Sequence, residues 1–316
     1  MAEALPFIGA FIVAAAMTFL LIPWLIPKLK EKGIVGKDLN KPGHPEVAEM
    51  GGIAVVLGFF AGVSVLLALD GIEDVELFYV SLSVVLGAAF IGMVDDIFDL
   101  RQRQKAFFPF LLALPLGAAI DPVIDLPYFG SIDLGPWMIL AAPFAITCAA
   151  NAGNMLEGFN GLGTGLGVIM SGTLILLGIH HDRLDGLYLL VPLMGGLIAF
   201  LWFNKYPAKV FPGDTLMLFM GAGIAAAGML SELYIQTVVI FIPMILEFFL
   251  KFRGHFRAEN YCSDASNGHL EYHGRIESLT HIVMKRLKVD ERKLVIVILA
   301  FEILLCLLVI AADVSL

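Results

Sequence analysis

Residues 77–105 read LFYVSLSVVLGAAFIGMVDDIFDLRQRQK, an apolar run of membrane length that ends in three carboxylates and three basic residues. If the run is a transmembrane helix, Asp95, Asp96 and Asp99 crowd its carboxyl end, where the helix dipole already disfavours anions. Asp95 and Asp99, at positions i and i+4, would share one helix face, and like charges at that spacing need a cation. The functional candidate is a divalent metal with a phosphate substrate. The alternative is local pairing with the basic residues that follow.

The composition is that of an integral membrane protein. The chain has 316 residues, of which 59% are hydrophobic and 16% are charged, and its mean hydropathy is +0.88. A bilayer core about 30 Å thick requires apolar stretches of about 17–25 residues. Ten stretches qualify, approximately 5–29, 51–69, 77–98, 106–120, 136–153, 161–180, 186–203, 214–231, 233–250 and 293–312. We therefore expect an all-α polytopic membrane protein with about ten transmembrane helices, formed by a single domain over residues 1–316.

The basic residues predict an orientation, because Lys and Arg stay on the cytoplasmic side of short loops. With ten spans, 19 of the 20 Lys and Arg residues fall on one side, and only Arg183 falls on the other. The net charge of −9 therefore hides a basic face suited to anionic lipid heads or to a phosphorylated substrate. We expect this face to be cytoplasmic and both termini to lie outside, in a cell or endoplasmic-reticulum-type membrane. The first span lacks a basic amino-terminal region, so we expect no removable signal peptide.

The internal connections hold nearly all of the distinctive polar residues. The first, residues 36–52, reads GKDLNKPGHPEVAEMGG, and its prolines and glycine forbid a continuous helix. A solvated connector is one interpretation of this loop. The other is a ligand pocket lined by Lys37, Asp38, Leu39 and Glu46. Loops on a rigid helical scaffold commonly carry catalytic groups, so we expect function to reside on this side.

A second internal segment, residues 151–163, reads NAGNMLEGFNGLG. Asn151 and Asn154, three residues apart, would share one helix face at the inner end of the fifth span. Amide oxygens are hard ligands that suit magnesium and add no charge beside substrate phosphates. The alternative is an interhelical hydrogen-bond network in which Asn160 caps the sixth span.

Residues 203–219, FNKYPAKVFPGDTLMLF, place Asp214 just after a Pro-Gly turn. Asp214 is a natural cap for the eighth span at this position. A helix amino terminus also attracts phosphate, and an acid held there can carry a magnesium ion that bridges to it.

In the longest internal connection, Arg253, His255 and Arg257 alternate along the chain. In an extended segment they would share one face. Cationic groups so arranged would clamp a diphosphate. The alternative is a solvated basic surface beside the membrane. The three cysteines are scattered, without the spacing of a metal site, and we expect unpaired thiols at Cys148, Cys262 and Cys306.

Together these segments resemble the polyprenyl-phosphate N-acetylhexosamine-1-phosphate transferase family, and most closely its eukaryotic and archaeal branch, the UDP-GlcNAc:dolichyl-phosphate GlcNAc-1-phosphotransferases. The likeness spans essentially the whole chain. Its motifs, in the family order, are DLNK with PE, VDDIFDLRQRQK, NAGNMLEGFNGL, VFPGDT and the Arg/His segment. The resemblance implies transfer of GlcNAc-1-phosphate, or a related acetamido-sugar 1-phosphate, from a UDP-sugar to a polyprenyl or dolichyl phosphate. UMP would be released, and lipid-linked glycan synthesis would begin with this step.

The resemblance also implies partners and a cofactor. Magnesium is expected, with manganese as a substitute. The partners are the UDP-sugar donor, the lipid phosphate acceptor and membrane lipids, with no nucleic acid. Family members commonly dimerise, so a homodimer is expected on this ground alone.

Carried over residue by residue, the resemblance assigns roles in the site. Asn154 and Asp214 match metal ligands, and the acidic pair with a phosphate-contacting lysine matches the catalytic residues Asp95, Asp96 and Lys105. Positions that hold the nucleotide sugar match Leu39, Glu46, Asn160 and Phe211, with Phe211 near uracil. Diphosphate and sugar contacts match Arg253 and His255. Four neighbours in the motifs complete the substrate-binding candidates: Lys37, Asp38, Asn151 and Arg257.

The chain departs from the family pattern at particular residues. Glu157 and Asn160 stand where the bacterial phospho-MurNAc-pentapeptide translocases have Asp, which argues against that donor. The run RGHFR, residues 253–257, matches neither the RHR-type run of eukaryotic members nor the triple histidine of the translocases. From another functional class, a secondary transporter would place ion-binding acids near the bilayer midplane. Only Glu247 and Glu302 lie inside the expected spans away from the cytoplasmic rim, where the other acidic clusters fall.

Overall fold

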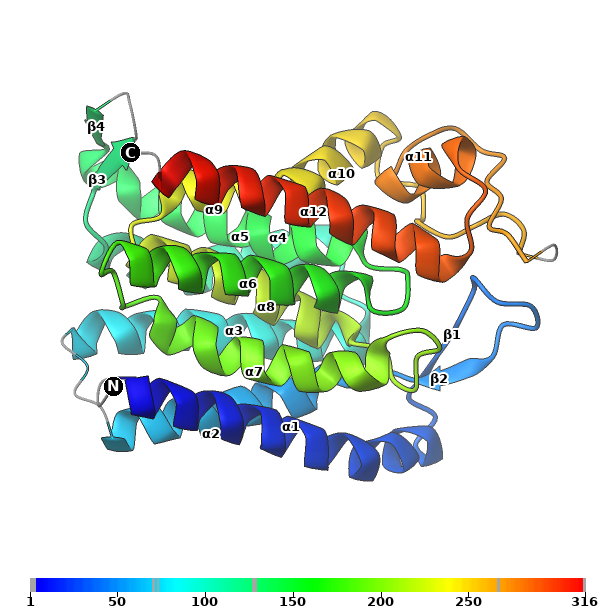
Figure 1. Ribbon diagram of the computed structural model, residues 1–316, viewed down its shortest axis with the longest axis horizontal. Helices are drawn as coiled ribbons and strands as arrows, with labels where there is room; N and C mark the ends of the chain where they lie inside the picture. The colour runs from blue at the N-terminus through cyan, green and yellow to red at the C-terminus, as the bar shows by residue number, and fades with distance from the viewer. Residues whose placement is uncertain (1–3, 70–71, 73, 127–129, 266–267, 315–316) are drawn as a thin grey trace.

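The computed structural model describes residues 4–69, 72, 74–126, 130–265 and 268–314. Its long helices lie side by side with roughly parallel axes (Figure 1). The two ends of the chain lie at one end of this bundle. The first β-hairpin and the loops after the tenth helix lie at the other, and we call this the site end.

The helices and strands follow one another along the described residues as in Figure 1. They are α1 (Ala4–Glu31), β1 (Val35–Lys37), β2 (Glu46–Ala48), α2 (Gly52–Leu69), α3 (Val75–Phe98), α4 (Gln102–Ala119), β3 (Val123–Leu126), β4 (Gly130–Asp133), a 3₁₀ turn (Gly135–Trp137), α5 (Met138–Leu156), α6 (Leu162–His180), α7 (Leu187–Asn204), α8 (Gly213–Leu230), α9 (Tyr234–Ile240), α10 (Ile242–Arg253), α11 (Leu279–Arg286) and α12 (Glu291–Val314).

An all-α membrane fold is confirmed, whereas the count of ten spans is not. Within the described ranges, eight helices are long and apolar enough to cross a bilayer, or nine if α9 and α10 form one span. Each predicted stretch coincides with helix. However, α4 does not qualify because its first turn is polar, and α9 and α10 are bent by 56°. Pro243 stands in the first turn of α10, where its missing N–H is tolerated.

The helix α8 forms the centre of the bundle and packs against α2, α3, α5 and α7. In lipid, helices associate through close packing rather than through the hydrophobic effect, and small residues allow the backbones to approach. A Cβ atom at Gly92 of α3 would collide with the backbone of Asp214, and one at Gly221 of α8 would collide with the backbone of Ala149 on α5. These two glycines therefore bring α3 and α5 directly against α8.

At the site end, the loop between α1 and α2 is an antiparallel hairpin in which Val35 pairs with Ala48 and Lys37 pairs with Glu46. A parallel bridge joins Ala48 to Val210, and the Phe211 amide donates to the Ala48 carbonyl at 2.7 Å. The connection between α7 and α8 is thereby fastened to the hairpin. Two loops that are far apart in sequence thus lie side by side at the site end.

Two further features bear on the predictions. The connection between α4 and α5 contains the antiparallel strands β3 and β4, which the apolar pattern did not predict. Cys148, Cys262 and Cys306 are free, as expected.

Candidate active site

Asp96 holds the amino terminus of α8. Its Oδ1 accepts the Asp214 amide at 2.6 Å, and its Oδ2 accepts the Thr215 amide at 3.0 Å and the Thr215 hydroxyl at 2.5 Å. The interpretation of Asp214 as the cap of α8 is therefore wrong. The N-cap is Pro212, which supplies no side-chain acceptor, and Asp214 lies in the first turn. Asp96 reaches across from α3 because its carboxylate meets the exposed N–H groups and positive end of α8.

Asp95, the neighbouring acid, is 2% exposed and forms an ion pair with Lys105. Its other oxygen accepts the Leu100 amide at 2.8 Å. Lys105 also binds Asp214 at 2.8 Å, and the two carboxyl groups contact each other. One ammonium thus bridges acids from α3 and α8. Asp99 does not share a helix face with Asp95, because it stands beyond the end of α3 with a positive φ of 51°.

The predicted amides of α5 join this cluster. The Asn154 side chain lies beside the Asp214 carboxyl group. Asn151 donates to the Lys105 carbonyl at 3.2 Å and to the Thr147 carbonyl at 2.9 Å. One asparagine therefore contacts the acid, and the other holds the backbone of the lysine that bridges it.

The donor set around Asp214 fits magnesium. Among the residues that the structure describes, no three His, Cys, Asp or Glu side chains are grouped as for a fully protein-bound metal. Magnesium instead uses one or two carboxylates, with substrate phosphates and water completing an octahedron of oxygens. Asp214 and the oxygen of Asn154 supply such hard donors, and the Asp214 side chain is 23% exposed and open to a ligand.

Glu49 is the acid that the sequence analysis missed. Burial raises its pKa, and the nearby charges of Asp96, Asp214 and Asp99 raise it further. Glu49 therefore faces the acidic cluster. Glu46, the residue chosen from the motif, is exposed on β2. A signal was available in the sequence, since Glu49 lies two residues before the Gly51–Gly52 pair at the start of α2.

Phe211 lies close to Glu49. A Cβ atom placed on Gly36 would meet the Phe211 ring at 3.1 Å and the Glu49 carboxylate at 3.2 Å. The half-buried Phe211 ring, the glycine of β1 and this acid thus line one corner beside the cluster.

Asn160 and Asp38, two residues predicted to bind the nucleotide sugar, contact each other. The Asn160 side-chain amide donates to Asp38 at 3.1 Å, and the Asn160 backbone amide donates to Glu291 at 2.9 Å. It does not cap α6, whose N-cap is Gly161 with no side-chain bond. Lys41 pairs with Asp38 and, at 3.4 Å, with Glu291. The first loop is therefore tied to the segment after α5 and to the start of α12.

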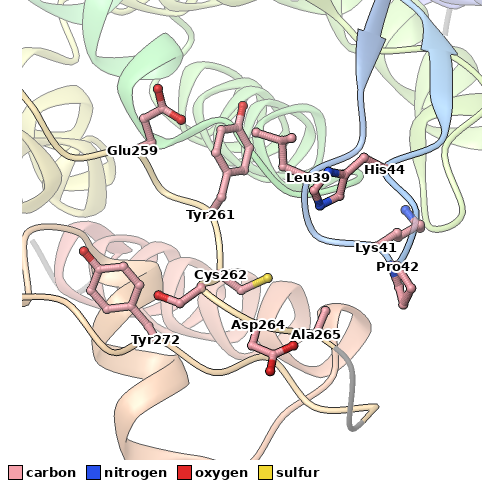
Figure 2. Close-up of a pocket in the computed structure, with 11 residues that line it drawn as sticks. Leu39, Lys41, Pro42, His44, Glu259, Tyr261, Cys262, Asp264, Ala265 and Tyr272 are labelled. Atoms are coloured by element: carbon pink, nitrogen blue, oxygen red, sulfur yellow. The ribbon is translucent and has the colours of Figure 1, made fainter.

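A cavity of ≈ 500 Å³ opens beside this loop. Figure 2 shows Leu39 and Lys41 on one side and Tyr261 and Tyr272 on the other. Leu39 therefore lines this cavity, and its role in binding a ligand stays a prediction. Lys37 is exposed on β1.

The cationic segment differs from its predicted form. Arg253 is the last residue of α10, and the chain then turns through left-handed residues at His255 and Phe256, with φ of 57° at each. The interpretation as an extended strand with one cationic face is therefore wrong. Arg253 donates to the carbonyl of Ile276, and the three cationic candidates, Arg253, His255 and Arg257, are exposed.

Comparison with known proteins places this geometry in a family. The family model described as glycosyl transferase family 4 matches residues 77–232. That range contains the acidic pair, the lysine, the two α5 amides and Asp214.

Three relatives are informative. A Saccharolobus solfataricus protein, provisionally named UDP-N-acetylglucosamine–dolichyl-phosphate N-acetylglucosaminephosphotransferase, is 39% identical over 304 residues, covering 94% of this chain and 92% of the relative. The Saccharomyces cerevisiae protein of the same name is 28% identical, over 76% of this chain and 65% of its own length. A phospho-N-acetylmuramoyl-pentapeptide-transferase of Borreliella burgdorferi is 31% identical, over 71% of this chain and 74% of its own length.

Proposed function

Because the chain belongs to glycosyl transferase family 4, we propose that it transfers GlcNAc-1-phosphate from UDP-GlcNAc to dolichyl phosphate or a related polyprenyl phosphate, with release of UMP. The observation that carries the proposal is the cluster of Asp95, Lys105, Asn154 and Asp214 at one end of the helical bundle. Acids, an ammonium and an amide gathered at a helix amino terminus suit a diphosphate with its cation.

Asp214 and Asn154 would hold magnesium, which would neutralise charge on the diphosphate when bound. Lys105 donates to Asp214 and would turn toward substrate phosphate, because an ammonium on a flexible stem moves easily. Asp96 keeps α8 in place. The acceptor phosphate monoester has a second pKa of about 6 and is already largely dianionic at neutral pH. Direct attack on the β-phosphorus of the donor therefore needs no strong base from Asp95 or Asp96.

The proposal includes an orientation of the protein in the membrane. The site end would face the cytoplasm, where nearly all Lys and Arg residues are expected, and the two chain ends would lie outside. The homodimer stays a prediction from the resemblance. A secondary transporter is not favoured, because the site cluster lies at the ends of α3 and α8.

The direct test is UMP release by purified protein supplied with UDP-GlcNAc, magnesium and a polyprenyl phosphate. Asp214→Ala should abolish release while the protein stays folded, and Asp99→Asn, which changes an exposed neighbouring acid, should leave it nearly unchanged. Unchanged turnover in Asp214→Ala would overturn the metal role. A burst of UMP without acceptor would overturn direct attack in favour of a covalent enzyme intermediate. A panel of UDP-sugars, with products read by mass, tests the donor.

A further inference from the structure

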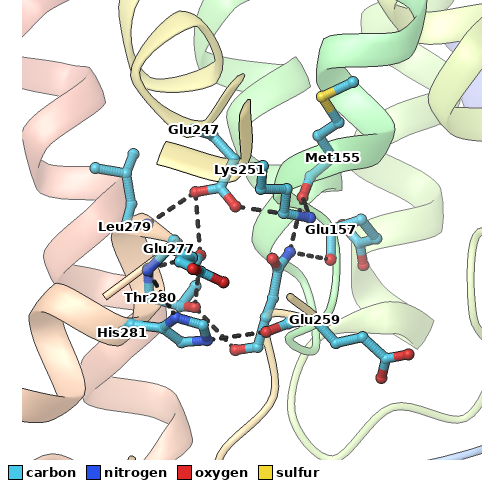
Figure 3. A network of polar contacts seen from close by, with 11 residues as sticks. Met155, Glu157, Glu247, Lys251, Glu259, Glu277, Leu279, Thr280 and His281 are labelled. Carbon is cyan, nitrogen blue, oxygen red and sulfur yellow. Dashed lines mark hydrogen bonds and ion pairs between the residues drawn. The ribbon is translucent and has the colours of Figure 1, made fainter. Parts of the chain in front are cut away.

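Two side chains outside the site described above hold the carboxyl end of α5 (Figure 3). The Lys251 ammonium donates to the Met155 carbonyl at 2.6 Å. The Asn260 amide donates to the same carbonyl at 2.8 Å and to the Glu157 carbonyl at 2.6 Å. The last carbonyls of a helix have no partner within the helix and carry partial negative charge. Three donor contacts therefore satisfy the end of α5 from outside.

The lysine is itself held in place. Its ammonium lies 3.7 Å from the carboxylate of Glu247, one turn earlier on α10, and Glu247 is fully buried. The other Glu247 oxygen accepts the Ser278 hydroxyl at 3.0 Å and the Leu279 amide at 2.8 Å, at the start of α11. Lys251 is thus fixed between α5, α10 and α11.

The asparagine is fixed from the same side. Its backbone carbonyl accepts the Thr280 hydroxyl at 2.8 Å. The neighbouring Glu259 carbonyl contacts Nε2 of His281 at 2.9 Å, while Nδ1 of that ring accepts the Glu277 amide. Nε2 therefore carries the hydrogen of a neutral ring, and burial lowers the pKa of His281 to about 4. The hydrogen bonds that hold the segment carrying Asn260 therefore persist at neutral pH.

This network joins two parts of the candidate site. Asn154 directly precedes Met155, and Arg253 follows Lys251 by two residues. We propose that Lys251 and Asn260 are positioning residues, which fix Asn154 relative to the cationic segment 253–257 so that both reach one diphosphate. The inference rests on the proposed function. Its physical basis is that small displacements of groups around a reacting centre have large effects on rate.

The test uses variants that keep buried charge balanced. Lys251→Met alone would strand the buried Glu247 carboxylate and endanger folding, so it is combined with Glu247→Gln. Asn260→Ala removes the other donor without changing charge. Lys288→Met, an exposed lysine beyond α11, is the matched control. Each protein is assayed for UMP release, and Mn²⁺ binding in the presence of UMP is measured by electron paramagnetic resonance.

Asn260→Ala and the Glu247→Gln/Lys251→Met pair should each lower kcat by about 10- to 100-fold, as other supports of ligand-holding side chains do, with less change in KM. Mn²⁺ affinity should fall in both, and Lys288→Met should behave as the wild type. Because Asn260 acts through Asn154, the double variant Asn154→Ala/Asn260→Ala should be no slower than Asn154→Ala alone.

Multiplicative losses in that double variant would overturn the inference, and so would unchanged Mn²⁺ affinity. A loss explained entirely by a smaller folded fraction, measured by size-exclusion chromatography, would also overturn it. If wild-type protein releases no UMP from UDP-GlcNAc, the proposed function fails instead. The Mn²⁺ affinities of the variants then decide the positioning role by themselves.

Discussion

Replacing Asp96 with alanine is expected to destabilise the folded protein by about 3 kcal/mol. Loss of a helix cap costs about 0.5–2 kcal/mol. The Thr215 amide is then left buried without its acceptor, which adds about 1–3 kcal/mol; the Thr215 residue is only 2% exposed. The Thr215 hydroxyl adds nothing further to this cost, because it can rotate toward a carbonyl one turn earlier. The Asp214 amide lies in a less buried residue, where water can replace the lost oxygen.

Asp96→Asn should also destabilise the folded protein, although the Asn side chain has nearly the same shape as Asp. Both carboxylate oxygens accept hydrogen bonds, so the new NH₂ group must face either the Asp214 amide or the two Thr215 donors. We expect a loss of about 2 kcal/mol, between one neutral hydrogen bond and the full cap. Asp99→Asn is the control, because Asp99 is exposed, and Asn tolerates the left-handed conformation found there.

The assay is reversible unfolding in mixed detergent micelles, titrated with sodium dodecyl sulfate and followed by tryptophan fluorescence, with UMP release measured on the same preparations. Both Asp96 variants should unfold earlier than the wild type and should release UMP slowly even where folded, because Asp214 is displaced. Wild-type unfolding curves combined with lost activity would refute this reasoning. Asp96 would then act on the ligand directly.

Three further predictions concern the same end of the bundle. Lys105→Met should cost about 3–5 kcal/mol in the same titration, because Asp95 is left buried without its cation; an unchanged midpoint would contradict the bridge. Burial raises the pKa of Glu157 to about 7 from 4.5, so the folded state binds a proton that the unfolded state releases, and stability should fall by at most about 3 kcal/mol as pH rises through that window. Glu157→Gln should remove this slope in melting curves recorded from pH 4.5 to 7.5, and an equal slope would exclude Glu157 as its source. Gly213→Ala should cost about 1–2 kcal/mol more than Gly43→Ala: both have a positive φ, but only at Gly213 would the new Cβ lie 2.7 Å from the carboxylate that caps α8.

The helical bundle was predictable from the apolar pattern, because every long apolar stretch must satisfy its own backbone in lipid. The pattern reports length and polarity, and it says little about interruptions. It therefore did not reveal the 56° bend around Phe241 or the strands β3 and β4. The stretch 106–120 coincides with α4, although the polar first turn of that helix keeps it from qualifying as a span by itself.

The grouping of several candidate residues was predictable, whereas their contacts were less so, and their roles stay predictions. Asp95, Lys105, Asn154 and Asp214 meet as the ordered motifs indicated. The cap of α8 could not be predicted, because local patterns place a cap beside its own helix, whereas Asp96 is 118 residues away in the chain. In the same way, the motif selected Glu46, but the register of the hairpin leaves the side chain of Glu46 exposed.

The three acids after the third span can now be distinguished by their partners. Asp96 lies between the negative end of α3 and the positive end of α8. The dipole of α3 disfavours its charge, and the dipole of α8, the helix that it caps, offsets that effect. Asp95 forms an ion pair with Lys105, and Asp99 is exposed. Glu49 faces Asp96, Asp99 and Asp214 in this corner, and burial together with these like charges raises its pKa. A bare diphosphate would be repelled by such a corner. On the proposed function, the same negative charge would favour a donor that arrives with a divalent cation, and this would reconcile a phosphate-binding site with its acidic lining.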